Sequence, residues 1–404
     1  MKKALIWIFL ATTFCANLLA QVDEYPSKER DEYYKNLEKS YIPFKPLKKS
    51  FISGYKPEYY EIHRSELNTQ SYKPEYSSPY LDSILSTMSY REYLRQSMIQ
   101  TIHAAKIDKI CNIEISQILT YEKKDSIEAF IYKSYEFEDR FSGGGPGIWV
   151  AYSENYGKDW NYYYTGIVQG QPIGVKVYPP RPLIKEKNKL EIEACLYRQI
   201  SPFGHPGVVS YERVKDDIYL VFDINVLARD SDGDGLTDII EDKLYLNKYN
   251  KDTDGDGIPD NLDMNPRVHY PRTEITKVYE AILNDEIDWN HENGIGRLLF
   301  SENTTHNTTD PTETLLIITD NEDLMGVQAK NHRIIFITKD EYLNKSKPYN
   351  QNPRGMGLSP LFKVDDMENT YIMAFHSSGT FGCNYLIRKT KDAWTIEMLT
   401  MWIS

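Results

Sequence analysis

The spacing of apolar and polar residues divides the chain into segments with different expected structures. Residues 81–106 contain neither Pro nor Gly and place apolar side chains at i, i+3 and i+4, which predicts a helix. From about residue 109 to residue 228, apolar side chains recur at every second position in short β-branched and aromatic runs. Gly, Pro, Asn and Asp separate these runs, as expected for antiparallel strands. Residues 81–228 are therefore predicted to form a helix plus a β-sandwich-like domain.

The last third of the chain combines a helical pattern with several strand patterns. Thr273 is a suitable N-cap residue for a helix whose apolar residues share one face. These residues are Ile275, Val278, Tyr279, Ile282 and Leu283. Runs such as TLLIITD, HRIIFITKDEY and CNYLIRKT follow and are typical of strands. Residues 267–404 are thus predicted to form an α+β domain, which is long enough to build its own core.

The segment before residue 81 has a different composition. Residues 21–80 are rich in Tyr, Lys, Glu, Pro and Ser, and the pentapeptide YKPEY occurs at residues 55–59 and again at 72–76. Because each proline favours extended backbone in its neighbour, we expect a largely extended Tyr/Pro-rich arm that packs along the next domain. The alternative is an arm that serves as a docking element for a partner.

The first twenty residues have the features of a secretory signal peptide. Lys2 and Lys3 precede a short apolar run, and small Ala20 comes just before the change to polar sequence. Residues 1–20 are thus predicted to be a signal peptide cleaved after Ala20. A retained anchor and a lipoprotein cut before Cys15 are the alternatives. No later segment reaches the roughly 18 apolar residues of a spanning helix, so we expect export to the periplasm, the cell surface or the medium, without a transmembrane segment.

Composition and charge exclude several classes of protein. The chain has 404 residues, of which 41% are hydrophobic, so it is not wholly disordered, collagen-like or a coiled coil. Its net charge of −12 argues against a nucleic-acid partner. Cleavage after Ala20 leaves three cysteines, Cys111, Cys195 and Cys383, which is an odd number and no complete disulfide framework. Cys111 and Cys195 both lie in strand-like segments and either form a pair or are buried thiols.

Two acidic segments carry the clearest chemical signal. Residues 230–241 read DSDGDGLTDIIE and residues 252–263 read DTDGDGIPDNLD. Both match the twelve-position calcium loop, which needs oxygen ligands at positions 1, 3, 5, 7, 9 and 12 and glycine at position 6. The predicted ligands of the first loop are Asp230, Asp232, Asp234, the carbonyl of Leu236, Asp238 and Glu241. Those of the second loop are Asp252, Asp254, Asp256, the carbonyl of Ile258, Asp260 and Asp263.

The charge of this region supports bound cations. Residues 230–263 contain ten Asp and one Glu against three Lys. Two carboxylates about 4 Å apart repel by about 4 kcal/mol at an effective dielectric constant near 20, so converging carboxylates need a divalent ion. Calcium is a hard ion that takes six to eight oxygens. Zinc or copper would favour His and Cys, which both loops lack. Two calcium ions are therefore predicted.

The two loops resemble thrombospondin type 3 repeats, which are EF-hand-like calcium-binding units common in exported bacterial proteins. The resemblance is limited to residues 230–263 and rests on DSDGDGLTD and DTDGDGIPDNLD at a spacing of 22 residues. It implies structural calcium and a short helix over DIIEDKLYL. A helix–loop–helix hand is disfavoured because the sequence before Asp230 is strand-like and Pro259 has no N–H at position 8. Asp263 is shorter than Glu241, so the second site is expected to be weaker or more hydrated.

A second motif is similar to the Asp box of sialidases. Residues 153–160 read SENYGKDW, with Asn155 and Asp159 where that family has Asp and Thr. In the family this motif closes a hairpin away from the active centre, so it implies a structural turn and no glycosidase. Gly143 to Gly147 are expected to form a loop between strands, and the isolated His205 and His376 to be structural.

These features predict a multidomain fold of mixed β and α+β class. A calcium-binding linker, residues 229–266, would join the antiparallel β-sandwich-like domain to the C-terminal α+β domain. The expected function is that of an exported, non-catalytic calcium-binding protein with a surface, adhesion or binding role, and with a protein or glycan partner that the sequence does not identify. One alternative is a carbohydrate-active or other hydrolytic surface enzyme with a calcium-stabilised linker, whose candidate carboxylates are Asp365, Asp366 and Glu368. Another is partner capture by the arm.

Overall fold

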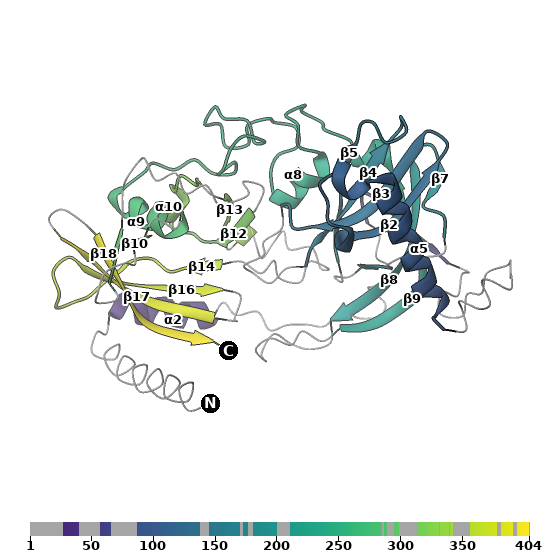
Figure 1. Ribbon diagram of the computed structural model, residues 1–404. Coiled ribbons are helices and arrows are strands. Elements are labelled where there is room, and N and C mark those ends of the chain that lie inside the picture. The colour runs from purple at the N-terminus through teal and green to yellow at the C-terminus, as the bar shows by residue number, and fades with distance from the viewer. Residues whose placement is uncertain are drawn as a thin grey trace.

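The computed structural model describes a β-rich mixed α+β fold in which most strands pair antiparallel (Figure 1). The described residues are 27–39, 57–65, 87–137, 145–169, 173–176, 181–199, 211–284, 287–288, 295–298, 314–330, 332–338, 340–341, 356–377, 381–390 and 394–403. The predicted signal peptide, the second YKPEY copy, Gly143, Gly144 and His205 lie outside these residues, as does the side chain of His376.

Residues 118–223 supply most of two antiparallel sheets that share one hydrophobic core. The strands of the first sheet pair in chain order, and they are β2 (Ile118–Lys124), β3 (Ile127–Ser134), β4 (Gly147–Ser153) and β5 (Asn161–Val168). The second sheet has the order β1-β9-β8-β6, with β7 also pairing with β8. Its strands are β1 (Glu61–Arg64), β6 (Ile173–Val175), β7 (Ile184–Glu186), β8 (Lys189–Gln199) and β9 (Tyr211–Asp223). Phe130 of β3 and Phe222 of β9 are fully buried in this first core.

Short helices lead into these sheets. Ser89 caps α5 (Tyr90–Ala105) by accepting a hydrogen bond from the Glu92 amide. The helix ends at Lys106, which has a left-handed backbone, and α6 (Ile107–Ile110) and the 3-10 turn η1 (Ile115–Gln117) follow. The predicted helix within residues 81–106 is therefore confirmed for residues 90–105, and the period-two strands after it are also found.

A third sheet of mixed type contains the C-terminal strands. Its order is β10-β11-β18-β17-β16-β14-β12-β13, and β15 also pairs with β16. Among the described strands of this sheet, only the pairs of β12 with β13 and with β14 are parallel. The strands are β10 (Ile287–Asp288), β11 (Ile295–Leu298), β12 (Thr314–Ile318), β13 (Arg333–Ile337), β14 (Met356–Leu358), β15 (Phe362–Lys363), β16 (Thr370–Ser377), β17 (Phe381–Lys389) and β18 (Trp394–Ile403).

Two helices of the C-terminal region accompany the third sheet. Thr273 caps α9 (Glu274–Leu283), as predicted, and the structure adds a capping box with Thr276. Val278 and Tyr279 of α9 are fully buried in a second core, with which Ile275 and Ile282 also pack. The four-residue helix α10 (Glu322–Met325) forms part of the connection between β12 and β13.

Strand β13 contributes to both cores. Ile335 and Ile337 belong to the first core, whereas Ile334 and Phe336 belong to the second. Because side chains alternate between the two faces of a strand, one face of β13 serves each core. Strand β13 of the third sheet therefore belongs to the first core as well as to the second.

Two segments differ from the sequence-based expectation. Residues 28–39 of the predicted extended arm form helix α2 (Lys28–Lys39), and Tyr33 of this helix contacts Phe362 with the ring centroids 5.3 Å apart. The expectation of extended backbone was wrong there, because it rested on composition and local proline effects rather than on this tertiary contact. The period-two pattern predicts strand up to about residue 228, but residues 224–227 form α7 (Ile224–Leu227), whose N-cap is Asp223. No helix in the described parts of the chain combines the length and apolar character needed to cross a membrane.

Candidate metal centre

Residues 229–263 fold as two loops with the same backbone pattern. Gly233 and Gly235 in the first loop, and Gly255 and Gly257 in the second, all have positive φ, which glycine adopts without strain. The amide of each position 9 then donates to the carbonyl just before the loop, from Asp238 to Arg229 and from Asp260 to Lys251, each at 2.8 Å. The repeat seen in the sequence is therefore also a repeat of conformation.

The first aspartate of each loop is held by the glycine amides. The two carboxylate oxygens of Asp230 accept from the Gly233 amide at 2.6 Å and the Gly235 amide at 3.0 Å. Asp252 makes the equivalent bonds, at 2.7 Å to the Gly255 amide and 2.9 Å to the Gly257 amide. These bonds turn the first carboxylate into the loop, which is what a position 1 ligand requires.

Three carboxylates of the first loop converge. Asp230, Asp232 and Asp234 each offer an oxygen within 4.8 Å of the other two. The Oδ2 atom of Asp232 is buried and has no hydrogen-bond partner. Desolvation raises the pKa of Asp234, and the neighbouring Asp232 and Asp230 raise it further. Such convergence is unfavourable without a cation.

Glu241, at position 12, is a further buried carboxylate of this loop. Helix α8 (Asp238–Leu244) carries it, and the predicted helix after the first loop is thereby confirmed. Glu241 is 0% exposed, and neither of its carboxylate oxygens has a hydrogen-bond partner. Burial raises its pKa to about 8, and the charges of Asp232 and Asp234 add to this shift. A buried carboxylate of this kind costs several kcal/mol unless a cation neutralises it, so the donor set fits a bound metal ion.

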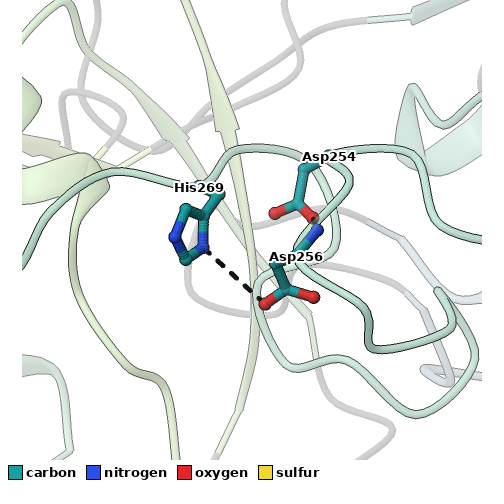
Figure 2. A group of neighbouring side chains, drawn as sticks. All are labelled: Asp254, Asp256 and His269. Carbon is teal, nitrogen blue, oxygen red and sulfur yellow. Dashed lines mark hydrogen bonds and ion pairs between the residues drawn. The ribbon is translucent and has the colours of Figure 1, made fainter.

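The second loop brings together a different set of side chains. Asp254, Asp256 and His269 each offer a ligand atom within 4.8 Å of the other two, as Figure 2 shows. Asp263 is 7% exposed, and its Oδ2 atom is buried without a partner. Burial raises the pKa of Asp263 to about 6, and Asp256 and Asp254 raise it further. His269 was not predicted, because it lies outside the twelve-residue motif and only the fold brings it to the loop.

The position 9 aspartates have a clear structural role. Asp238 accepts from the amide of Ser231 at 2.8 Å and from its hydroxyl at 2.9 Å. Asp260 accepts in the same way from Thr253, at 2.8 and 2.6 Å. Both oxygens of each carboxylate thus close the loop onto its second residue. Metal ligation by these two residues, and by the carbonyls of Leu236 and Ile258, stays a prediction.

The two loops are joined to each other. The amide of Asn261 donates to Oδ2 of Asp234 at 3.1 Å, and Nζ of Lys251 donates to the carbonyl of Gly233 at 3.0 Å. The charge of Asp260 also contributes to the raised pKa of Glu241. The two loops therefore form a single structural unit.

This unit contacts both hydrophobic cores. On one side, Leu236 and Ile239 are buried in the first core, and Tyr59 donates a hydrogen bond to Asp242 of α8. On the other side, the amide of Ile334 in β13 donates to the carbonyl of Met264 at 2.7 Å. Figure 1 shows the segment as the teal and green trace that leads from α8 towards α9.

Arg333 anchors the end of the second loop. Its side chain is almost fully buried and donates to the carbonyls of Asn261 at 3.1 Å and Asp263 at 3.3 Å. The guanidinium also lies 5.1 Å from the ring centroid of Phe137. Burial lowers the pKa of Arg333. One buried cation thus links the second loop, the third sheet and the segment after β3.

The segment similar to an Asp box forms the predicted hairpin turn between β4 and β5. Ser153 Oγ accepts from the Gly157 amide at 3.1 Å, and Asn155 Oδ1 accepts from the Asp159 amide at 3.0 Å. Trp160 donates to the Gly157 carbonyl at 3.0 Å and packs against Phe130. Each of these contacts stabilises the turn.

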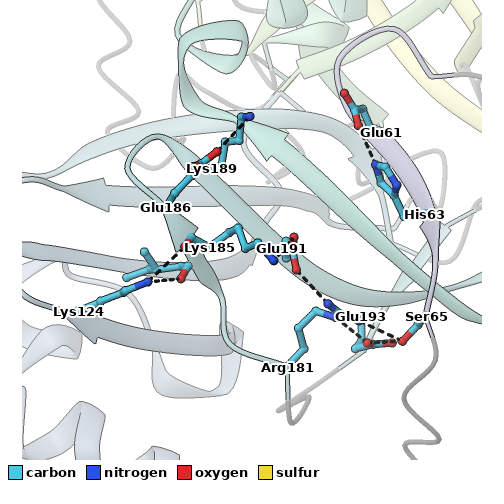
Figure 3. A network of polar contacts seen from close by, with 11 residues as sticks. Glu61, His63, Ser65, Lys124, Arg181, Lys185, Glu186, Lys189, Glu191 and Glu193 are labelled. Atoms are coloured by element: carbon cyan, nitrogen blue, oxygen red, sulfur yellow. Dashed lines mark hydrogen bonds and ion pairs between the residues drawn. The ribbon is translucent and has the colours of Figure 1, made fainter.

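The remaining carboxylates of interest lie outside the two acidic loops. Asp365, Asp366 and Glu368 are exposed in the turn between β15 and β16. A buried carboxylate pair that the sequence did not reveal lies on β8, where Arg181 donates to Glu191 at 2.9 Å and to Glu193 at 2.8 Å (Figure 3). Arg181 pairs with both carboxylates and Lys185 lies 3.6 Å from Glu191, so these residues form an internal ion-pair cluster.

The structure bears on whether Cys111 and Cys195 form a disulfide. Cys111, Cys195 and Cys383 are free thiols in the structure. Cys195 is buried, and its Sγ donates to the Gly174 carbonyl at 3.3 Å. The reading of Cys111 and Cys195 as unpaired thiols therefore agrees with the structure, although Cys111 is only half-buried.

Searches of known protein families, of curated proteins and of solved structures found no match for this chain.

Proposed function

We propose that residues 229–266 bind two calcium ions and that the ions hold the segments on either side in a fixed relation. The observation that carries the proposal is Glu241, a fully buried carboxylate with no hydrogen-bond partner, which faces the charges of Asp232 and Asp234. A buried carboxylate without a hydrogen-bond partner is expected where a cation belongs. The buried, unpartnered oxygens of Asp232 and Asp263 support the same interpretation in each loop.

Calcium is the ion of choice for the first loop because all its candidate ligands are oxygens. Hard cations with flexible coordination suit carboxylates and carbonyls, and the glycines at positions 4 and 6 allow the sharp turns around the ion. We expect dissociation constants of about 10⁻⁴–10⁻³ M, as in extracellular calcium modules.

The role of calcium is structural. Without the ions, the carboxylates repel each other and the loops lose their order, whereas bound ions couple loop folding to metal binding. The loops are attached through Ile239 to the first core and through Met264 to β13, so ordering them fixes both attachments. The chain is then an exported, non-catalytic protein whose calcium-binding linker joins a β-sandwich-like domain to an α+β domain, with a surface, adhesion or binding role.

Limited proteolysis tests this proposal. The chain is digested with a protease that cuts after Asp or Lys, with excess calcium or with a chelator, and the cuts are mapped by mass spectrometry. Cleavage within residues 230–266 is expected to be at least tenfold faster in chelator, with Lys251 as a convenient site. Cleavage after Lys277 in α9 serves as the internal control. Equal cleavage rates in the two conditions would refute the structural role, and calorimetry showing no calcium uptake would refute binding.

A further inference from the structure

His269 gives the second loop a donor that the first loop lacks. The residue follows the loop in the chain, and the backbone returns so that its imidazole faces Asp254 and Asp256 (Figure 2). Its Nδ1 atom lies 3.8 Å from Oδ2 of Asp256. The imidazole is exposed on its other side, so it is free to adjust its side-chain torsions.

The geometry is close to that of two ligands on one ion. Two ligand atoms that are each about 2.1 Å from a metal ion lie about 3.0–3.6 Å apart at angles of about 90–120°. The 3.8 Å separation therefore needs a closure of only a few tenths of an ångström by an exposed side chain. Asp263, at position 12 of the same loop, provides an independent sign of a ligand, because it is nine-tenths buried and its Oδ2 has no hydrogen-bond partner.

The first loop has no imidazole at the equivalent position. The residue that corresponds to His269 in the first repeat, 22 positions earlier, is Asn247. Its Oδ1 accepts from the Tyr249 amide at 3.3 Å, so it caps a turn. The first loop instead ends in Glu241, whose two oxygens are both buried without partners. One loop thus offers oxygens alone, whereas the other offers oxygens and an imidazole nitrogen.

We propose that the second loop, with His269 as a nitrogen ligand beside Asp254, Asp256 and Asp263, is a mixed nitrogen–oxygen site that binds a divalent transition metal ion, represented by Zn²⁺, in preference to calcium. Imidazole suits zinc, copper, iron and nickel, whereas calcium gains little from a nitrogen donor. The first loop keeps its preference for calcium. The inference rests on the proposed function in one respect only, namely that these loops bind metal ions.

The test uses the full chain lacking residues 1–20 and follows binding by isothermal titration calorimetry. Zn²⁺ is titrated into calcium-loaded protein, and released calcium is measured at the same time. Wild type is expected to take up one tight Zn²⁺ and release one calcium. In His269→Gln the Zn²⁺ affinity should fall at least tenfold, while two calcium ions still bind, because the Gln carbonyl is a hard ligand. His103→Gln, at an exposed histidine in the last turn of α5, is the matched control and should bind Zn²⁺ like wild type.

A spectroscopic measurement identifies the ligand directly. Mn²⁺ bound to the second loop of wild type should show hyperfine coupling to an imidazole nitrogen in pulsed electron paramagnetic resonance, and His269→Gln should lack it. Unchanged Zn²⁺ affinity in His269→Gln, or an equal loss in His103→Gln, would overturn the inference while calcium binding stands. A wild-type chain that takes up neither ion would overturn the proposed function as well.

Discussion

Replacing Glu241 by Gln should make the metal-free chain more stable while removing its response to calcium at the first loop. Glu241 is fully buried, and neither of its oxygens has a hydrogen-bond partner. Burial and the nearby aspartates raise its pKa from the ordinary 4.5 to about 8. The substitution keeps the shape of the side chain and removes the charge that needs a cation.

The magnitude follows from the difference between the two pKa values. At pH 7 the folded, metal-free chain keeps Glu241 protonated, whereas the unfolded chain gains from ionising it. Each pH unit above 4.5 contributes about 1.4 kcal/mol, which amounts to about 3 kcal/mol at pH 7. The Gln amide would still lack partners, at a cost of about 1–2 kcal/mol. We therefore expect a net gain of about 1–2 kcal/mol at pH 7.

The pH dependence has a definite sign. Because the folded pKa is raised, the contribution of Glu241 to the stability of the metal-free chain is present below pH 4.5 and is lost as the pH rises through 8. Glu241→Gln removes this loss, so its advantage over wild type should grow between pH 5 and pH 8.5. In wild type, the stabilisation by calcium should grow over the same range, since the ion binds the ionised carboxylate.

Urea unfolding at pH 5, 7 and 8.5, with a chelator or with calcium, measures the stability of the metal-free chain, its pH dependence and the stabilisation by calcium. A calcium concentration of about 10 mM is roughly 10 to 100 times the expected dissociation constants. Glu322→Gln, at an exposed carboxylate of α10, is the matched control and should change none of them. If Glu241→Gln destabilised the metal-free chain more at pH 8.5 than at pH 5, the buried carboxylate would not be the source of the calcium dependence.

Three further substitutions probe separate parts of the structure. Arg333→Met leaves the carbonyls of Asn261 and Asp263 without donors, so it should lower the free energy of unfolding in urea by about 2–4 kcal/mol and speed proteolysis near residue 265. Stability equal to that of wild type would contradict the anchoring role. Gly257→Ala meets no atom within 4 Å, so its cost is the left-handed backbone alone, about 1–2 kcal/mol, and calorimetry should show roughly tenfold weaker metal binding at the second loop only. Trp160→Phe loses the bond to the Gly157 carbonyl and should lower stability by about 1 kcal/mol without altering calcium uptake; a change in uptake would tie the hairpin to the metal centre.

Features that depend on near neighbours were predictable from the sequence. The α9 cap needs only Thr273 and a partner three residues later, and the loop glycines take the positive φ that their motif requires. The hairpin between β4 and β5 is likewise closed by contacts within residues 153–160. In each case the decisive hydrogen bonds span only a few residues, so the sequence contains the whole interaction.

Features that depend on distant residues were not predictable. Helix α2 has few apolar residues, and its contact through Tyr33 is with Phe362, near the other end of the chain. The parallel pairing of β12 with β13, and the approach of His269 to Asp256, also depend on how the chain folds back on itself. Periodicity identifies a strand and a motif identifies a loop, but neither specifies which remote segment will lie beside it.

Because side chains alternate along β13, this one strand separates the two hydrophobic cores and contributes to both. Ile335 and Ile337 would be exposed to water if the first core opened, and Ile334 and Phe336 if the second did. Opening either core therefore exposes one face of β13, and the other core depends on the opposite face of the same strand. The two cores should accordingly unfold in one cooperative transition. A fragment that ends before residue 333 would lack Ile335 and Ile337, and its first core would be incomplete.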